Sequence, residues 1–444
     1  MLRDIIYKIY DKYSSLKGRK SVYSILNEIQ SLNKVSDKNV INDVVLKKVN
    51  NMLNHATEHV AYYKNLKLYA AKISSLDEIT KYPVLTKDII RRNFPEKTMA
   101  TELMNRAQYN TTSGSTGEPL EFYNDAEAAP YRSASFMFFN TWMGVDERAV
   151  HWNLKSLGKY TTRQKIIYWL NGKHLYSVMD VKKENLPEIV TEIEKIQPKY
   201  LEGYTASLVR LAKLIDESDA RLKHSPRAIL ATSENLTEFH RGLLEKAFSS
   251  EVFNRYGSRE FCGAVAQECN IHKGLHVNPL LTYLEIVDDE GDPVSEGEKG
   301  RLLVTDLNNY VMPFIRYDIG DIGVKGPDDC ECGSSFQVIE SIEGRKGEFI
   351  VDKDGNNIPF VTISAYLFRR HYTKYVYTYQ FIQDRKGEIL LKIVPTEKFN
   401  EEIKNEISTT LNQILPEFKT ELVVVDEIPA EKTGKTPFLK TNIN

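Results

Sequence analysis

The sequence has few of the features that mark secreted, membrane-spanning or disulfide-stapled proteins. It contains four unevenly placed cysteines in 444 residues, which do not resemble the disulfide framework of a secreted domain. No apolar run approaches the ~20 residues that a membrane-spanning helix needs. The first eight residues are charged and have no apolar core, so we expect no signal peptide. These absences predict a cytoplasmic protein without a membrane span.

Excess charge of one sign is also missing. The 59 basic and 61 acidic residues leave a net charge of −2, so the chain as a whole has no field that would attract nucleic acid. Hydrophobic residues make up 41% and charged residues 27%, which is ordinary for a globular protein. The length suits two or three domains, and we expect a monomer or a homodimer without a nucleic-acid partner.

The hydrophobic pattern changes along the chain and predicts an α/β fold class. Residues 1–60 have helical spacing, residues 130–260 alternate between helices and short apolar strands, and residues 275–345 contain strands and turns. Residues 1–346 are therefore predicted to form a large N-terminal domain of layered sheets and helices, with a β-rich subdomain at about 275–345. Residues 347–444 are predicted to form a small α+β C-terminal domain. The predicted helices include 186–196, 206–214, 237–247, 362–368 and 400–415, and the predicted strands include 200–202, 228–231, 349–351 and 377–382.

A run of hydroxyl residues and glycines at 111–119, Thr-Thr-Ser-Gly-Ser-Thr-Gly-Glu-Pro, stands out. Glycines let the backbone approach a ligand closely, and successive N–H groups can then cradle an anion. The run is not a Walker A loop, because no Gly-Lys-Ser/Thr follows its glycines. Taken alone, it could equally be a flexible linker.

Four later segments carry residues suited to a nucleotide, although each alone could be an ordinary turn or tail. Tyr256 ends a buried-looking strand and can stack on a flat base, and Glu260 follows it as a ligand for a hard cation such as Mg²⁺. Asp321 lies in a Gly-Asp turn and can accept both hydroxyls of a ribose. Arg345 lies in a Gly-Arg-Lys-Gly run at the inferred domain boundary. Lys435 follows a glycine near the C-terminus as a point charge for anionic oxygens.

The order of these five motifs resembles that of the adenylate-forming superfamily, which includes the acyl-CoA synthetases. Within it the chain is most similar to the phenylacetate–CoA ligase-like family, and closest to its capsule-biosynthesis ligase-like branch. The upstream run Pro-Val-Leu-Thr-Lys at 83–87 and the run Met-Pro-Phe-Ile-Arg-Tyr-Asp at 312–318 support that branch. The resemblance covers the chain from about residue 50 to its end.

The resemblance implies an AMP-forming ligase with two half-reactions. A carboxylic acid first attacks ATP to give an acyl-adenylate and pyrophosphate, and coenzyme A then takes the acyl group. The implied catalytic residues are Lys435, Glu260 and Thr116, with Mg²⁺ held by Thr116 and Glu260 and with Lys435 on a mobile C-terminal domain. The implied nucleotide-binding residues are Ser113, Gly114, Ser115, Thr116, Gly117, Ser233, Glu234, Tyr256, Gly257, Asp321 and Arg345.

The acceptor is the weakest part of the resemblance. The segment after Gly347 does not show the glycine-rich turn that relatives place near coenzyme A. An amide or ester ligase that transfers the acyl group to an amine or hydroxyl, for example in polysaccharide or secondary-metabolite biosynthesis, is therefore the alternative. A non-catalytic nucleotide-binding protein is a third reading, which the retained Lys435, Glu260 and Asp321 argue against.

The cysteines suggest a metal site in the β-rich region. Cys330 and Cys332 form a C-x-C-G turn, and Cys269 and His276 lie upstream, with His272 as a spare. Three thiolates and one imidazole match a closed structural Zn²⁺ site. Reduced surface cysteines are the alternative.

Overall fold

A computed structural model gives the arrangement of most of the chain. It describes residues 2–16, 20–66, 72–112, 120–155, 161–218, 222–261, 263–345, 349–360, 363, 367, 372, 375–431 and 436–443. The described chain forms two compact units. The first comprises residues 1–149, 166–172 and 253–343, and the second comprises residues 150–165, 173–252 and 344–444.

The first unit begins with helices, as the spacing at 1–60 predicted. Buried apolar residues on α2, α3 and α6 pack into one core with Ala264 on β8 and with residues of the later connections between strands, such as Leu281 and Phe336. Asp37 and Thr86 accept backbone N–H groups as the N-caps of α3 and α5. The helices are α1 (Leu2–Leu16), α2 (Val22–Leu32), α3 (Lys38–His59), α4 (Ala61–Asn65), α5 (Lys87–Asn93) and α6 (Ala129–Trp142). Residues 166–170 of α7 (Thr162–Leu170) also belong to this unit.

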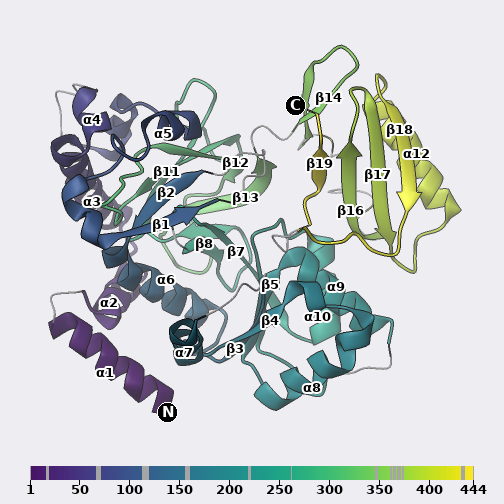
Figure 1. Cartoon of the computed structure of the whole chain (residues 1–444), viewed down its shortest axis with the longest axis horizontal. Helices are drawn as coiled ribbons and strands as arrows, with labels where there is room; N and C mark the ends of the chain where they lie inside the picture. Colours follow the sequence, from purple (N-terminus) through teal and green to yellow (C-terminus); the bar gives the residue numbers. More distant parts are fainter. Residues whose placement is uncertain are drawn as a thin grey trace. The chain divides into compact units, whose positions relative to one another are not determined.

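Two strand groups complete this unit (Figure 1). The hairpin of β1 (Ala107–Thr111) and β2 (Glu121–Asp125) is antiparallel, and its connection contains the Ser/Gly run. The other strands follow the spatial order β10-β11-β12-β13-β9-β8-β7. These strands are β7 (Glu251–Ser258), β8 (Gly263–Glu268), β9 (Leu275–Val277), β10 (Thr282–Val287), β11 (Lys299–Asp306), β12 (Tyr317–Lys325) and β13 (Val338–Arg345).

The second unit contains parallel strands in the order β6-β5-β3-β4, with helices between them in sequence. Trp152 and Leu154 on β3, Leu201 on β5 and Ile229 on β6 are buried, as expected for a parallel sheet covered by helices, whereas β4 is half-buried. The elements are β3 (His151–Lys155), β4 (Lys173–Ser177), α8 (Leu186–Ile196), β5 (Tyr200–Tyr204), α9 (Thr205–Asp216), β6 (Ala228–Thr232) and α10 (Glu238–Phe248).

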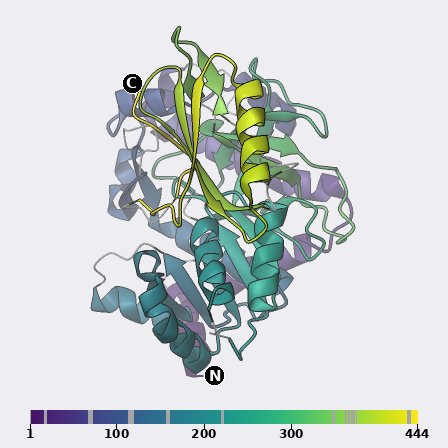
Figure 2. The ribbon, with the colours of Figure 1, turned by 90° about the vertical axis from the view of Figure 1, so that its right-hand side faces the viewer.

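The C-terminal part of the second unit is a small α+β layer, as predicted. Its four-stranded sheet has the order β18-β17-β16-β19, and α12 runs along one side of it (Figure 2). A hairpin of β14 and β15 precedes it, and the helix expected at 362–368 lies mostly outside the described residues. The elements are β14 (Phe349–Val351), β15 (Asn357–Pro359), β16 (Val376–Gln383), β17 (Glu388–Pro395), α12 (Glu401–Ile414), β18 (Lys419–Val424) and β19 (Leu439–Thr441).

The mixed α/β class is thus confirmed. The predicted boundary near residue 346 stays a prediction. Among the described residues, no helix is both long and apolar enough to cross a membrane.

Candidate functional site

The base of the Ser/Gly loop is anchored in the first unit. The N–H of Thr112 donates to the carbonyl of Leu120, and the N–H of Leu120 donates to the hydroxyl of Thr112, both at 2.9 Å. The guanidinium of Arg259 donates to the carbonyl of Thr111 at 3.2 Å. The loop residues predicted to bind phosphates lie outside the described residues: Ser113, Gly114, Ser115, Thr116 and Gly117. The anchoring places the start of the loop next to the residue that precedes Glu260.

Glu260 is a buried carboxylate held by two hydroxyl donors. Ser258 donates to Oε2, and Tyr317 donates to Oε1 at 3.2 Å. Its carbonyl accepts a 2.9 Å bond from the side-chain amide of Asn124 on β2. Burial and the adjacent carboxylate raise the pKa of Tyr317 well above its usual range, so Tyr317 remains a donor at neutral pH. The carboxylate is therefore fixed as an acceptor beside the loop, as a metal ligand or phosphate neighbour must be.

Tyr256 and Asp321 are brought together, although the sequence separates them. The phenol of Tyr256 donates to Oδ2 of Asp321 at 2.6 Å, and Asp321 is buried. Gly257 has a packing reason to be glycine, because a Cβ there would lie 2.3 Å from the carbonyl of Gly263. This geometry gives a carboxylate and an aromatic ring in one place, which suits a ribose and a base.

The run at 315–321 divides into structural and site residues. Arg316, in a left-handed conformation at φ 47°, forms a buried ion pair with Glu285 at 3.0 Å and donates to the carbonyl of Tyr82 at 2.9 Å. Burial raises the pKa of Glu285, and the guanidinium beside it lowers it in part. The arginine of this run therefore anchors the chain, and Tyr317 and Asp321 turn toward the site residues.

In the second unit, Glu234 connects the end of β6 with the segment after Lys435. Its carboxylate accepts the N–H of Ala206, at the start of α9, at 2.7 Å and the N–H of Thr436 at 3.0 Å. The preceding residue, Ser233, has φ 67°, a strained conformation for a residue other than glycine. Ligands of parallel sheets bind at the carboxyl ends of strands, where these residues lie. Lys435 itself lies outside the described residues.

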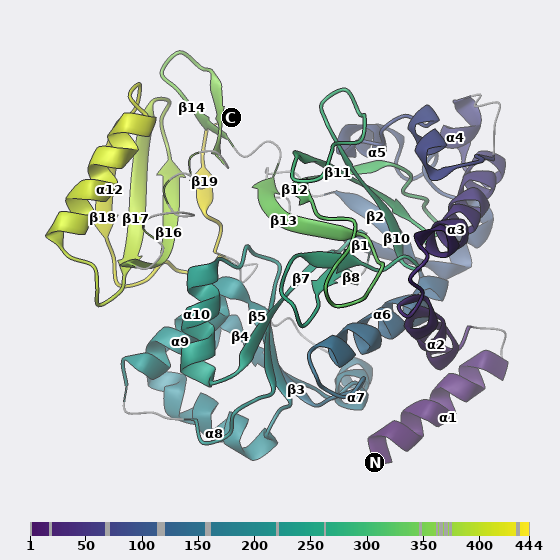
Figure 3. The same ribbon diagram turned by 180° about the vertical axis from the view of Figure 1, so that it is seen from behind.

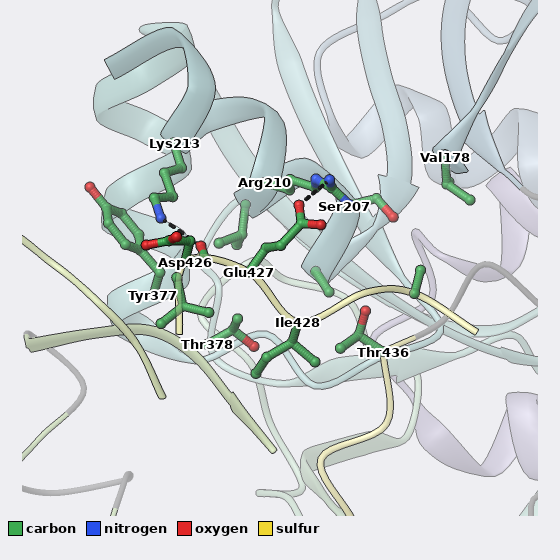
Figure 4. Close-up of a pocket in the computed structure, with 14 residues that line it drawn as sticks. Val178, Ser207, Arg210, Lys213, Tyr377, Thr378, Asp426, Glu427, Ile428 and Thr436 are labelled. Atoms are coloured by element: carbon green, nitrogen blue, oxygen red, sulfur yellow. Dashed lines mark hydrogen bonds and ion pairs between the residues drawn. The ribbon is translucent and has the colours of Figure 1, made fainter. Parts of the chain in front are cut away.

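The approach to Lys435 is docked on α9 around a small cavity (Figure 4). Glu427 pairs with Arg210, and the ammonium of Lys213 donates to the carbonyl of Asp426 at 3.1 Å. The same ammonium lies 5.3 Å from the centre of the Tyr377 ring. The cavity of about 50 Å³ holds no more than a water or two. It is too small for a nucleotide, and its contacts serve instead to position the segment that leads to the lysine.

The four predicted zinc ligands form one cluster. Their ligand atoms all lie within 4.8 Å of one another. Sγ of Cys269 is 3.8 Å from Sγ of Cys330, and Sγ of Cys332 is 3.5 Å from Nε2 of His276. A tetrahedral site with Zn–S distances near 2.3 Å has S–S edges of about 3.8 Å, so the side chains fit zinc. His272 is not part of the cluster, because its Nδ1 lies 3.2 Å from Glu268.

The chain is similar in sequence to two kinds of known protein, CapK and the phenylacetate–coenzyme A ligases. Residues 350–442 match the CapK C-terminal domain. The chain is 27% identical to Protein CapK of Staphylococcus aureus over 385 residues, which cover 84% of this chain and 82% of that protein. It is 24% identical over 377 residues to the phenylacetate-coenzyme A ligase of Thermus thermophilus, covering 79% and 80% of the two chains. The chain is a homologue of CapK and of the phenylacetate–coenzyme A ligases.

Solved structures agree with this grouping at the level of the fold. A 2-hydroxyisobutyryl-CoA ligase in the postadenylation state superposes with a TM-score of 0.72 over 90% of this chain and 89% of that one, at 17% identity. A benzoate CoA ligase from Burkholderia xenovorans gives a TM-score of 0.52 over 72% of this chain and 65% of that one, at 16% identity. The chain therefore shares the fold of these two CoA ligases.

The sequence motifs did not indicate the roles of several residues of the candidate site. Asn124, Arg259 and Tyr317 hold the loop and Glu260 through contacts between segments more than 50 residues apart. The backbone of Thr436 contacts Glu234 across 202 residues. Arg345 ends β13, and its side chain lies outside the described residues.

Proposed function

We propose that this protein activates a carboxylic acid with ATP as an acyl-adenylate, releases pyrophosphate, and then transfers the acyl group to coenzyme A. The carrying observation is the geometry around β7, where Tyr256 meets Asp321 and Glu260 is fixed next to the anchored base of the loop. The similarity to phenylacetate–coenzyme A ligases supports this chemistry. The ATP-dependent reaction is consistent with a location in the cytoplasm.

In the proposed reaction two anions, the substrate carboxylate and the α-phosphate of ATP, must be brought together, and the residue roles follow from this. The loop from Ser113 to Gly117 binds the phosphates that leave, and Asp321 accepts the ribose hydroxyls. Ser233, Glu234, Tyr256 and Gly257 border the base, and Arg345 contacts ribose or phosphate. Lys435 reaches the carboxylate and the α-phosphate, where its charge offsets the repulsion between them. No protein nucleophile is needed, because the substrate carboxylate supplies it.

Glu260 and Thr116 are the proposed ligands of Mg²⁺. The carboxylate of Glu260 is ordered by two hydroxyl donors and has oxygen atoms of the kind that Mg²⁺ prefers. When bound, the ion supplies charge that neutralises the phosphates. The protein's own contribution is to hold the carboxylate at one place beside the loop.

An amine or hydroxyl acceptor in place of coenzyme A is the second candidate function. The C-terminal segment matches the CapK C-terminal domain, and the sequence after Gly347 lacks the glycine-rich turn expected near coenzyme A. Both observations concern the part of the chain that would meet the acceptor. Adenylation is common to both functions.

A pyrophosphate-release screen over carboxylic acids, with and without coenzyme A, tests these proposals. Release that rises with coenzyme A and yields a thioester supports the ligase. Release without consumption of coenzyme A favours the second acceptor class. A protein with an intact fold that releases no pyrophosphate with any acid contradicts adenylation.

We expect Glu260→Gln to weaken the use of Mg²⁺. The amide keeps the size of the side chain but removes the charge, so more Mg²⁺ is needed for half-maximal pyrophosphate release and the maximal rate falls by about 10²-fold. A magnesium titration of the initial rate measures both quantities. Glu290→Gln, on an exposed turn, is the matched control and keeps the wild-type curve. An unchanged curve for Glu260→Gln removes Glu260 from the metal site.

A further inference from the structure

The N-terminal helix α1 exposes an apolar side to solvent. A surface helix normally turns its apolar side to the core and its polar side to water. In α1 five apolar side chains are exposed, Ile5 49%, Ile6 37%, Ile9 63%, Tyr13 54% and Leu16 80%, whereas Tyr7 packs on Tyr23 of α2. Their spacing of three and four residues places Ile5, Ile9, Tyr13 and Leu16 along one stripe.

The opposite side of α1 is held to the protein by polar contacts. The carboxylate of Asp11 is buried and accepts the N–H of Val22 at 2.7 Å and the hydroxyl of Ser21 at 2.5 Å. The guanidinium of Arg3 donates to the carbonyl of Arg148 at 2.5 Å. These contacts fix the rotation of α1 about its axis, so the apolar stripe is directed outward by specific bonds.

A second exposed apolar group lies beside the first. On α7, Ile166, Ile167 and Trp169 are 54%, 42% and 51% exposed. Arg148 joins the two helices, because its guanidinium lies 3.6 Å from the centre of the Tyr7 ring on α1 and also donates to the carbonyl of Leu170. Figures 1 and 3 show the N-terminal end of α1 close to α7. Exposed apolar groups gathered in this way mark an interaction surface.

The charge of the two segments is strongly positive in a chain with a net charge of −2. Residues 1–20 contain six basic and two acidic residues, a net charge of +4, and α7, residues 162–170, contains two basic residues and no acidic one. The two acidic groups of α1 are paired, Asp4 with Arg3 and Arg148, and Asp11 with Ser21 and Val22. Lys8 and Lys12 are exposed.

We propose that α1 and α7 form a docking surface for an anionic lipid bilayer, on which the protein lies without spanning it. An apolar stripe with a tryptophan and a tyrosine, flanked by lysines, is the composition of helices that lie in the membrane interface. Basic residues near an anionic leaflet add attraction, and this attraction is sensitive to salt. A second copy of the chain fits less well, because a two-fold contact brings this basic surface against itself.

Vesicle flotation tests the proposal directly. We expect the protein to float with vesicles of equal parts phosphatidylglycerol and phosphatidylcholine, and to stay behind with phosphatidylcholine alone. Raising the ionic strength from about 0.05 to 0.5 M should lower the bound fraction about tenfold. Trp169 is half-exposed, Trp152 is fully buried and Trp142 packs on the core, so a blue shift of emission on binding should disappear in Trp169→Phe.

Two sets of variants separate the apolar and basic contributions. The triple change Ile5→Ser, Ile9→Ser and Leu16→Ser should weaken binding about 100-fold, and Lys8→Glu with Lys12→Glu at least about tenfold. The matched controls are Val40→Ser with Met104→Ser, at exposed apolar sites elsewhere, and Lys34→Glu with Lys47→Glu, at exposed lysines of the same unit. Both should bind like the wild type, and thermal melts check that every variant is folded.

Three results would overturn the proposal. The first is a folded wild-type protein that does not bind anionic vesicles at low salt. The second is equal binding by the α1 variants and their controls. The third is a dimer in sedimentation velocity that the triple change dissociates, without vesicle binding, which would assign the surface to a second copy.

Discussion

Replacement of Lys435 by alanine is expected to slow the first half-reaction strongly and to spare the second. Lys435 is the proposed charge at the carboxylate and the α-phosphate, so its loss should slow acyl-adenylate formation by about 10²–10³-fold. Thioester formation from a supplied acyl-adenylate does not need that charge, and its rate should stay within about twofold of the wild type. The two steps are measured separately, as pyrophosphate release and as acyl-CoA formation from the synthetic adenylate.

The surroundings of the lysine explain why the effect should be local. The segment before it is docked through Glu427 on Arg210, and the residue after it, Thr436, is bonded to Glu234. These contacts do not involve the side chain of Lys435, so the variant should keep its thermal stability. Lys432→Ala removes a charge three residues away and serves as the control. Equal loss of both half-reactions in Lys435→Ala would contradict the assigned role.

The spacing of apolar residues predicted those helices and strands whose own residues carry a periodic pattern. The helix predicted at 186–196 has the same bounds as α8, because its apolar residues recur at helical spacing. The strand at 349–351 was likewise found as β14. In contrast, β19 has three residues and pairs in parallel with Phe381 on β16 through Leu439. Such a strand is stabilised by distant partners and leaves no periodic signal.

In the candidate site, too, the sequence predicted residue types but not the contacts between distant segments. Motif order gave the residue types and their expected ligands, but it assigned Tyr256 and Asp321 to different parts of a nucleotide. The structure joins them by one hydrogen bond across 65 residues. Helical spacing likewise predicted α1 but could not tell which side it buries, because that side is chosen by Asp11 and its partners on the next helix. Contacts between distant segments therefore carry the information that the sequence pattern lacks.

Removal of zinc is expected to destabilise the first unit. Cys269 follows β8, His276 lies on β9, and the Cys330–Cys332 turn precedes β13, so one ion would join three neighbouring strands. Wild-type protein should contain about one zinc per chain, and Cys332→Ser much less. Loss of a structural metal costs at least about 4 kcal/mol, so the Tm should fall by at least roughly 8–16 °C at about 2–4 °C per kcal/mol.

Elemental analysis and calorimetry, each with and without a chelator, measure the two quantities together. Cys262→Ser changes a cysteine that is not one of the four proposed ligands, and this variant should keep the metal. Added chelator should lower the Tm of the wild type but not that of Cys332→Ser, because the variant has already lost the ion. Zinc below about half an equivalent in wild-type protein would contradict a structural site. If the wild-type protein contains a full equivalent of zinc but Cys332→Ser melts at the same Tm, the metal does not stabilise the fold. The strands would then be held by their apolar core, in which Phe336 and Ile339 are fully buried.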